Sequence, residues 1–369
     1  MTLDVKGLHH FTAISGNPTE NAKFYVNILG LRMVKKTVNH DAPQMYHLFY
    51  GDKEGTPGSS ITFFPEMTDQ DGKAGAGMVT ELGLGIPVDS INYWKKRLEE
   101  KKIDFEIETW NGDETLSFED NSGLSLRLVP VETDDYTTWE ESEVPEENQI
   151  QGMHHVTLSV RDSSGIEPIL TEMGLEKSDD YEKTYFDAED GSGVEVKETN
   201  KQRTMGRGSV HHVAFKAGET EQEIENWRDK LKRMGMRPSP AISRKYFTST
   251  YARTPVGILF EFSSMGPGYT ADESVEELGS SLVLPEKLEA QREQIEATLP
   301  EFDEDEIVYT VYRMDGELVE NRESMGQRVS IISIEPEGIE ELHSHGEETI
   351  LDTEVRYQIL EMLYDADRG

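Results

Sequence analysis

The segment GLHHFTAIS at residues 7–15 recurs as GMHHVTLSV at residues 152–160 and as SVHHVAFKA at residues 209–217. Each copy places a histidine doublet in a short run of apolar and β-branched residues, which is typical of a β-strand. The three segments contain six of the ten histidines of the chain. A pattern that returns along a chain indicates a repeated structural unit, so we expect each doublet to open one copy of that unit.

The residues after the first doublet complete the unit. Asn17 and Pro18 predict the start of a helix, and Gly30 predicts its end. Three predicted strands follow, at residues 31–38, 45–51 and 59–65. The unit therefore has the order β-α-β-β-β over about 60 residues.

Three more units are predicted further along the chain. The second opens at residues 78–84 without a histidine, and its helix is INYWKKRLEEKK. The third and fourth open with the other two doublets, and the fourth ends at GILFEF, residues 257–262. The predicted organisation is units one and two in residues 1–130, an acidic linker at 131–149, units three and four at 150–268, a tail with a helix at 269–299, and an acidic appendage at 300–369.

Composition excludes several classes of function. The 369-residue chain has 73 acidic and 36 basic residues and a formal charge of −37, which disfavours binding to nucleic acid or anionic membranes. It has no cysteine, so any metal must be bound by histidine and carboxylate. We expect a cytoplasmic protein because the chain shows no targeting segment and no long apolar run. The acidity also fits a protein adapted to concentrated salt.

The doublets suggest a metal site. Histidines from two opening strands and a carboxylate from a closing strand would form a two-His-one-carboxylate triad, which suits iron(II) and leaves positions open for substrate and oxygen. Manganese(II) could use the same donors. Glu261 interrupts the apolar run ILFEF, where an unpaired buried carboxylate would be costly. Arg244 and Tyr251, near the preceding strand, are candidates for polarising an oxygenated substrate.

Longer motifs resemble the ring-cleaving, hydroquinone-type extradiol dioxygenases of the vicinal oxygen chelate, or glyoxalase/bleomycin resistance, superfamily. They are LHHFTAIS, LGLRMVKKTVNHD, MYHLFYGDKEGTPGSSITFFP, VHHVAF and FTSTYARTPVGILFE. The resemblance covers roughly residues 5–295. It implies an α+β fold of four βαβββ modules paired into two half-barrel domains, with an acidic C-terminal extension outside. It also implies that modules one and four form the site, while modules two and three form a scaffold.

The resemblance further implies roles for individual residues. The iron(II) ligands would be His10, His212 and Glu261. Catalytic residues would be His211, Tyr251 and Arg244, and His9, Tyr46 and His47 would be further substrate-binding candidates. The implied reaction opens a dihydroxylated aromatic ring, with dioxygen as the second substrate and His211 and Tyr251 acting as acid or base.

Some alternatives stay open. His155 in the third module would replace His10 as first ligand if the enzyme were a catechol extradiol dioxygenase. Glu81, His155 and Glu195 occupy positions analogous to metal ligands and could form a second site. A non-catalytic small-molecule binding protein of the same fold is another class, and a homo-oligomer is compatible with the sequence.

Overall fold

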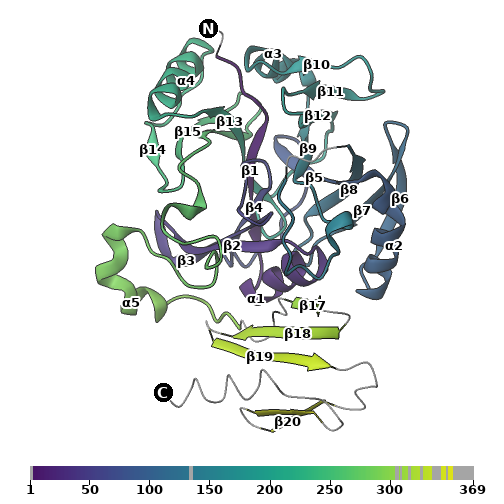
Figure 1. The fold of residues 1–369 in the computed structure, drawn as a ribbon. Helices are drawn as coiled ribbons and strands as arrows, with labels where there is room; N and C mark the ends of the chain where they lie inside the picture. Colours follow the sequence, from purple (N-terminus) through teal and green to yellow (C-terminus); the bar gives the residue numbers. More distant parts are fainter. Residues whose placement is uncertain are drawn as a thin grey trace.

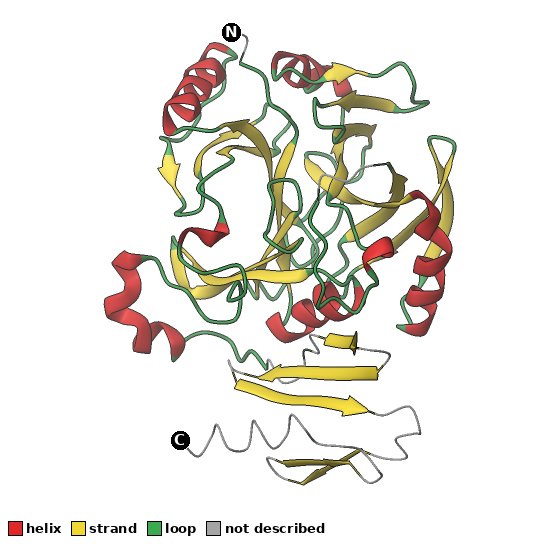
Figure 2. Cartoon of the chain, viewed as in Figure 1, coloured by secondary structure: helices red, strands yellow, loops and turns green. Residues whose placement is uncertain are grey.

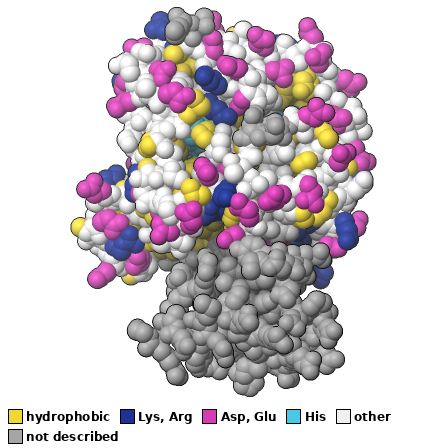
Figure 3. Space-filling model, viewed as in Figure 1, with side chains coloured by type: hydrophobic (Ala, Val, Ile, Leu, Met, Phe, Trp, Pro, Cys, Tyr) yellow, Lys and Arg dark blue, Asp and Glu magenta, His cyan; other side chains and the backbone are white. Residues whose placement is uncertain are grey.

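The computed structural model describes residues 3–132, 136–303, 307, 310–314, 317–324, 327–334, 342–345 and 348–351. Two curved eight-stranded sheets hold the strands up to residue 264, and the helices lie at their periphery (Figures 1 and 2). Each sheet mixes parallel and antiparallel neighbours. Asp and Glu side chains are spread over the face seen in Figure 3, as the negative charge predicts.

The first sheet joins the two ends of the repeat. Its strand order is β14-β15-β16-β13-β1-β4-β3-β2, so strands from the start of the chain lie beside strands about 200 residues later. The strands are β1 (Leu8–Ser15), β2 (Arg32–Asn39), β3 (Ala42–Gly51), β4 (Ser60–Pro65), β13 (Val210–Gly218), β14 (Ile242–Ser243), β15 (Thr248–Arg253) and β16 (Leu259–Ser264).

The second sheet is built from the intervening residues. Its order, β10-β11-β12-β9-β5-β8-β7-β6, repeats the arrangement of the first sheet. The strands are β5 (Met78–Pro87), β6 (Phe105–Trp110), β7 (Asp113–Glu119), β8 (Ser125–Val131), β9 (Met153–Val160), β10 (Glu176–Lys177), β11 (Thr184–Asp187) and β12 (Gly193–Glu198). The predicted α+β fold of paired β-α-β-β-β units is confirmed, with unit one beside unit four and unit two beside unit three.

The helices lie where the sequence predicts them. In α4 the Thr220 side chain accepts from the Glu223 backbone N–H and Glu223 returns the bond, which is a capping box. Ile224, Trp227 and Leu231 are buried at helical spacing, and the Trp227 ring stacks 4.9 Å from Phe262 of the sheet. The helices are α1 (Pro18–Ala22), which continues as a π-helical segment (Lys23–Ile28), α2 (Ile91–Glu100), α3 (Glu167–Glu172), α4 (Glu221–Arg233) and α5 (Arg292–Glu296).

A buried lysine fastens the tail to the first sheet. Lys35 Nζ of β2 donates to the Tyr269 carbonyl at 3.1 Å and to Asp272 Oδ1 at 2.9 Å, and it also contacts Glu273. The helix predicted over PEKLEAQREQIEATL is divided into a 3₁₀ segment (Glu286–Gln291) and α5. Gln291, with φ −112°, lies between them outside the helical region, so one continuous α-helix cannot form there.

The C-terminal segment contains further strands, as its apolar runs predict. These are β17 (Thr310–Met314), β18 (Glu317–Ser324), β19 (Gln327–Ile334), β20 (Leu342–His345) and β21 (Glu348–Leu351). The apolar run VRYQILEML in the same segment is typical of a helix, but it lies outside the described residues. Within the described part of the chain, no helix has the length and apolar character needed to cross a membrane.

Candidate metal centre and substrate cavity

Strand register brings three candidate ligands to one point of the first sheet. Ala214 on β13 lies opposite His10 on β1 and, on its other side, opposite Glu261 on β16. His212 lies two residues before Ala214, so it points to the same face of β13. The small Ala214 side chain leaves the space that the three larger side chains share.

The three side chains approach one another through their donor atoms. His212 Nε2 lies 2.9 Å from Glu261 Oε2, and His10 Nε2 lies 3.3 Å from the same oxygen. The two Nε2 atoms are 3.4 Å apart. All three residues are buried, with Glu261 completely so. This group is one of two among the described residues whose donor atoms could hold a metal ion.

These residues fit a metal ion. Ligands at 90° and about 2.1 Å from one cation would lie about 3.0 Å apart, close to the separations found here. Glu261 Oε1 accepts from Ser263 at 3.0 Å, which leaves Oε2 facing the two imidazoles. Burial alone would raise the pKa of Glu261, but His10 and His212 outweigh it and hold that pKa well below its usual range. The site thus offers a carboxylate and two imidazoles.

The first histidine of each doublet is an extra residue in its strand pairing. His9, His154 and His211 each occupy a register shift, while the histidine after each keeps a paired position. The two rings of a doublet therefore lie together, with Nδ1 atoms 2.8–2.9 Å apart. The doublets thus depart from the regular alternation of a strand, on which neighbours face opposite sides.

The contact between the Nδ1 atoms of His9 and His10 orients the His10 ring. The Ser264 carbonyl lies 3.1 Å from His9 Nε2 and can only accept, so that nitrogen carries the proton of the neutral ring. Burial, with a contribution from His10, lowers the pKa of His9 to about 3 and keeps it neutral. His9 Nδ1 must then accept from His10 Nδ1–H. The lone pair of His10 Nε2 is left facing His212 and Glu261, as a metal ligand requires.

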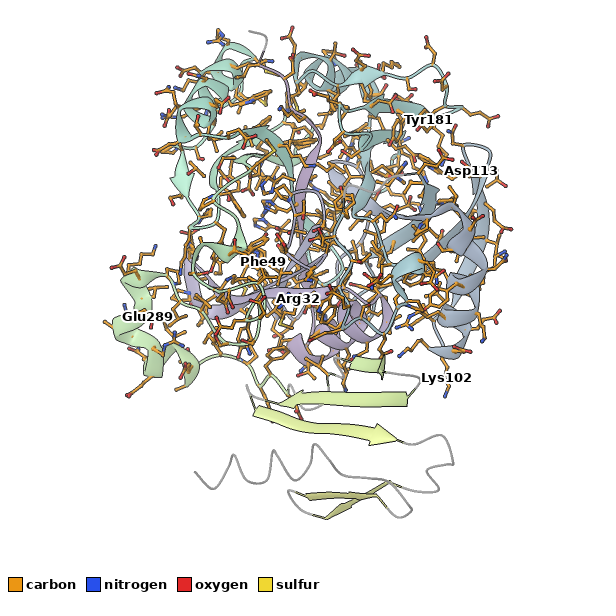
Figure 4. The ribbon with its side chains drawn as sticks, in the orientation of Figure 1. Arg32, Phe49, Lys102, Asp113, Tyr181 and Glu289 are labelled. Carbon is orange, nitrogen blue, oxygen red and sulfur yellow. The ribbon has the colours of Figure 1, made fainter. Side chains whose placement is uncertain are left out.

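A cavity of about 290 Å³ lies beside the three donors. His10, His212 and Glu261 are among its lining residues, and aromatic side chains form much of its wall. Phe49, one of these, lies within the first sheet, as Figure 4 shows. The other lining residues are Thr37, Asn39, His40, Asp41, Ala42, Met45, His47, Phe64, Met67, His211, Arg244, Tyr246, Phe247 and Tyr251.

Two polar side chains of the predicted site act together in this cavity. Arg244 Nε–H donates to Tyr251 Oη at 3.1 Å, and the guanidinium is 3.3 Å from Asp41. The Tyr251 ring lies edge-on to His212, 5.8 Å between centroids. Burial and the nearby Glu261 carboxylate raise the pKa of Tyr251 well above its usual value. Tyr251 is therefore a neutral phenol that can donate its proton in a hydrogen bond.

Of the remaining predicted site residues, some line the cavity and others do not. His211 and His47 line the cavity, and His47 Nε2 lies 2.9 Å from the Thr62 hydroxyl. His9 lies behind His10 and is not a lining residue, and Tyr46 packs 5.7 Å from Phe302. His155 belongs to the second sheet, where it groups with Glu81 and Glu195, so the structure does not assemble the alternative triad of His155, His212 and Glu261.

Several residues of the cavity escaped sequence reasoning. Phe49, Phe64 and Phe247 form apolar walls, and the Thr12 hydroxyl lies 2.9 Å from His212 Nε2. Phe49 and Phe64 lie on predicted strands, but their patterns are those of ordinary core strands. Only the pairing of distant strands shows which aromatic rings face the site.

Comparisons with known proteins agree with this geometry. The chain matches the model of the Glyoxalase/Bleomycin resistance protein/Dioxygenase superfamily over residues 7–128 and 152–262. It is 37% identical to the candidate ring-cleaving dioxygenase MhqE of Bacillus subtilis (strain 168) over 304 residues, covering 81% of this chain and 100% of MhqE. A chlorohydroquinone/hydroquinone 1,2-dioxygenase of Sphingobium indicum is 30% identical over 310 residues, covering 80% of this chain and 96% of that protein. A crystal structure of a candidate dioxygenase from Bacillus subtilis matches with a TM-score of 0.77 and 34% identity, covering 81% of this chain and 98% of the other.

Proposed function

The chain belongs to the Glyoxalase/Bleomycin resistance protein/Dioxygenase superfamily, among its ring-cleaving dioxygenases, and we propose that it uses iron(II) to open the ring of hydroquinones with dioxygen. The observation that carries this proposal is the convergence of His10, His212 and Glu261 in the lining of an aromatic-walled cavity. Two imidazoles and one carboxylate are the donor set of non-haem iron(II) oxygenases. Manganese(II) is the alternative ion for the same donors.

The cation would supply two things when bound, a lowered pKa for a hydroxyl beside it and open positions at which ring and dioxygen meet. The protein supplies the rest. The cavity, about 290 Å³, is slightly smaller than the roughly 300–1,000 Å³ of common ligand pockets, so a single ring fits it better than a fused ring system. Phe49, Phe64 and Phe247 give that ring an apolar, π-rich surface.

Tyr251 and Arg244 would stabilise negative charge on substrate oxygen. Because Arg244 Nε–H is donated to Tyr251 Oη, the phenolic hydrogen can be donated in turn, either to the Glu261 carboxylate that it contacts or to a substrate oxygen in the cavity. The guanidinium also polarises the phenol and places a fixed positive charge near the site. Donors aimed at developing charge in a buried site commonly supply a large share of catalysis.

The ring nitrogen of His211 that carries the proton determines what this residue can do in the cavity. With the lone pair of His212 Nε2 used as a ligand, the His212 proton lies on Nδ1, 2.8 Å from His211 Nδ1. His211 Nδ1 then accepts, and its own proton lies on Nε2. Burial and His212 lower the pKa of His211 to about 4, so the ring is neutral near pH 7. We assign His211 as a hydrogen-bond donor to substrate or oxygen in preference to a general base.

Hydroquinones are favoured over catechols by two observations. The Sphingobium indicum relative is named for hydroquinone substrates. The histidine that the catechol alternative needs, His155, lies in the other sheet with its own carboxylates.

Oxygen uptake tests the proposal. Protein stripped of metal, reloaded anaerobically with iron(II) and desalted is offered hydroquinone, chlorohydroquinone, methylhydroquinone or catechol in an oxygen electrode. We expect uptake with loss of aromatic absorbance, faster with the hydroquinones than with catechol. Glu261→Gln and His212→Ala should lose uptake together with the iron bound at this centre, while Glu106→Gln, a change at an exposed glutamate of β6, should keep both.

Three outcomes would contradict it. Iron-loaded protein that consumes no oxygen with any hydroquinone contradicts the reaction, and preference for catechol contradicts the substrate. Full activity in Glu261→Gln contradicts the ligand set.

A further inference from the structure

The second sheet repeats the metal centre of the first, position by position. Thr157 on β9 lies opposite Glu81 on β5 and opposite Glu195 on β12, just as Ala214 lies opposite His10 and Glu261. His155 lies two residues before Thr157, as His212 lies two residues before Ala214. Glu81, His155 and Glu195 therefore correspond to His10, His212 and Glu261.

The equivalence extends to neighbouring positions. Tyr185 lies opposite Glu195 on the adjacent strand, as Tyr251 lies opposite Glu261. His154 is the extra residue of its pairing, with its Nδ1 2.9 Å from His155 Nδ1.

The donor atoms of this second group also converge. Atoms of Glu81, His155 and Glu195 lie within 4.8 Å of one another, and His155 Nε2 is 3.6 Å from Glu81 Oε1. His155 is completely buried, and its Nε2 has no hydrogen-bond partner among the described residues. A buried imidazole nitrogen without a hydrogen bond is costly, and at 3.6 Å His155 Nε2 lies beyond hydrogen-bond distance of the Glu81 oxygen that it faces.

We propose that Glu81, His155 and Glu195 form a second binding site for a divalent transition-metal ion, separate from the catalytic centre of the proposed function. The ion would take the lone pair of His155 Nε2 and one oxygen from each carboxylate. Such a mixed nitrogen and oxygen donor set suits manganese(II), iron(II) or zinc(II).

The charge balance of the first centre is preserved in the second. Glu81 replaces neutral His10 and adds one negative charge. In the first sheet, Thr62 lies opposite Thr12. The corresponding pair in the second sheet is Arg127 opposite Gly83, so Arg127 takes the place of Thr62 and adds one positive charge. Arg127 Nε and an outer nitrogen donate to the two oxygens of Glu81 at 2.9 and 3.0 Å. The side chains at equivalent positions therefore carry the same net charge in both centres, and Glu108, 2.7 Å from Arg127, and Lys183, 3.5 Å from Glu195, add one charge of each sign around the second.

The hydrogen bonds around the ligands leave room for a cation. Trp110 Nε1–H donates to Glu195 Oε2 at 3.0 Å, and the Trp110 ring stacks on His155 at 4.6 Å. Each carboxylate oxygen has a second lone pair for a metal. Arg127 donates to both oxygens of Glu81 and so favours the ionised carboxylate that a metal ion needs.

The chemistry around this centre differs from that of the first. Glu81 and Glu195 line a cavity of about 290 Å³ whose wall is mostly polar, and Lys183, Lys197 and Lys201 line it too. The wall has no phenylalanine, unlike the catalytic cavity. Water or a small anion would complete the coordination here, and an aromatic ring would not be favoured.

Manganese(II) titration followed by electron paramagnetic resonance of the free ion tests the proposal. The salt concentration is raised to suppress weak binding to surface carboxylates. Wild-type protein should bind two equivalents, His212→Ala one and His155→Ala one, and the double variant should bind none tightly. In the His212→Ala background, Glu195→Gln should weaken the remaining site by at least about tenfold, whereas Glu106→Gln should not.

The result separates this site from the catalytic one. One equivalent in wild type that is lost in His212→Ala and kept in His155→Ala would overturn the second site, leaving Arg127 as the cation that neutralises Glu81. Glu195→Gln retains the shape of the side chain and an oxygen for the Trp110 N–H. Its effect on manganese(II) affinity therefore tests the second site even where His155→Ala fails to fold. Failure of the catalytic triad alone would leave the equivalent that depends on His155.

Discussion

Replacing His9 with phenylalanine should weaken metal binding without touching a ligand. Phenylalanine preserves a planar ring beside Phe247, which lies 5.1 Å from His9. It removes the nitrogen that accepts from His10 Nδ1–H and the N–H that donates to the Ser264 carbonyl. The His10 ring then loses the contact that fixes its orientation and proton position.

The size of the effect follows from these two contacts. Each buried group left without a partner costs about 1–3 kcal/mol, so the free energy of unfolding should fall by about 2–6 kcal/mol. Only the His10 contact bears on the metal. Loss of such a supporting contact commonly costs about 10–100-fold in metal affinity, which corresponds to about 1.4–2.8 kcal/mol.

Isothermal titration of metal-free protein with manganese(II), made in the His155→Ala background so that the proposed second site does not contribute, measures this affinity directly. His9→Asn is the matched comparison because its side-chain oxygen can occupy the position of His9 Nδ1 and accept from His10. We expect His9→Asn to bind manganese(II) more tightly than His9→Phe. Wild-type affinity in His9→Phe would refute the reasoning, since His10 would then need no partner.

Other predictions concern single features. Tyr251→Phe should lower kcat by about 10²–10³-fold in the oxygen assay while retaining bound iron, because one donor to developing charge is lost. Glu81→Gln should be less stable than wild type by about 3 kcal/mol at pH 7, because the folded state lowers the pKa of Glu81 from 4.5 to about 2. Urea unfolding at a series of pH values measures this difference. The difference should shrink as the pH falls from 4.5 to about 2, because wild type loses this stabilisation over that range. Lys35→Met should lower the free energy of unfolding, measured in urea, by about 1–3 kcal/mol, because the half-buried Glu273 loses its lysine while Asp272 keeps Lys245 and the Tyr246 hydroxyl. A chain ended after Asp303 should keep its oxygen uptake per folded molecule, and loss of uptake with an intact fold would show that the appendage completes the site.

Local sequence predicted the strands that open the units and the first helix, but not the division of the tail helix at Gln291. The doublets stand in apolar runs of strand length, and the first helix has a recognisable start at Asn17. Strand pairing between distant residues is different, because it depends on how two faces bury each other and not on any local pattern. The pairing of units one and four came from the resemblance to a family.

In the candidate site, too, local sequence predicted some residues, whereas others depend on the pairing of distant strands. Glu261 was found from sequence because a carboxylate in an apolar run needs a partner. The choice between Tyr46 and His47 could not be made, because strand neighbours face opposite sides and the sequence does not say which side is the cavity. His9 was expected to touch substrate, but the register shift at β1 places it behind His10.

The strands of the second sheet lie, in the sequence, between the two halves of the first sheet, and this order constrains how the protein folds during synthesis. The strands of the second sheet run without interruption from residue 78 to 198, whereas the first sheet joins residues as far apart as His9 and Ser264, separated by 255 positions. During synthesis on the ribosome, the second sheet can close as soon as β12 has emerged. Strand β1, with its two histidines, must wait with an unpaired edge until β13 has been translated, which exposes it to wrong pairing. Metal loading of the proposed catalytic centre would therefore follow translation of nearly three quarters of the chain, while the ligands of the proposed second site are all translated earlier.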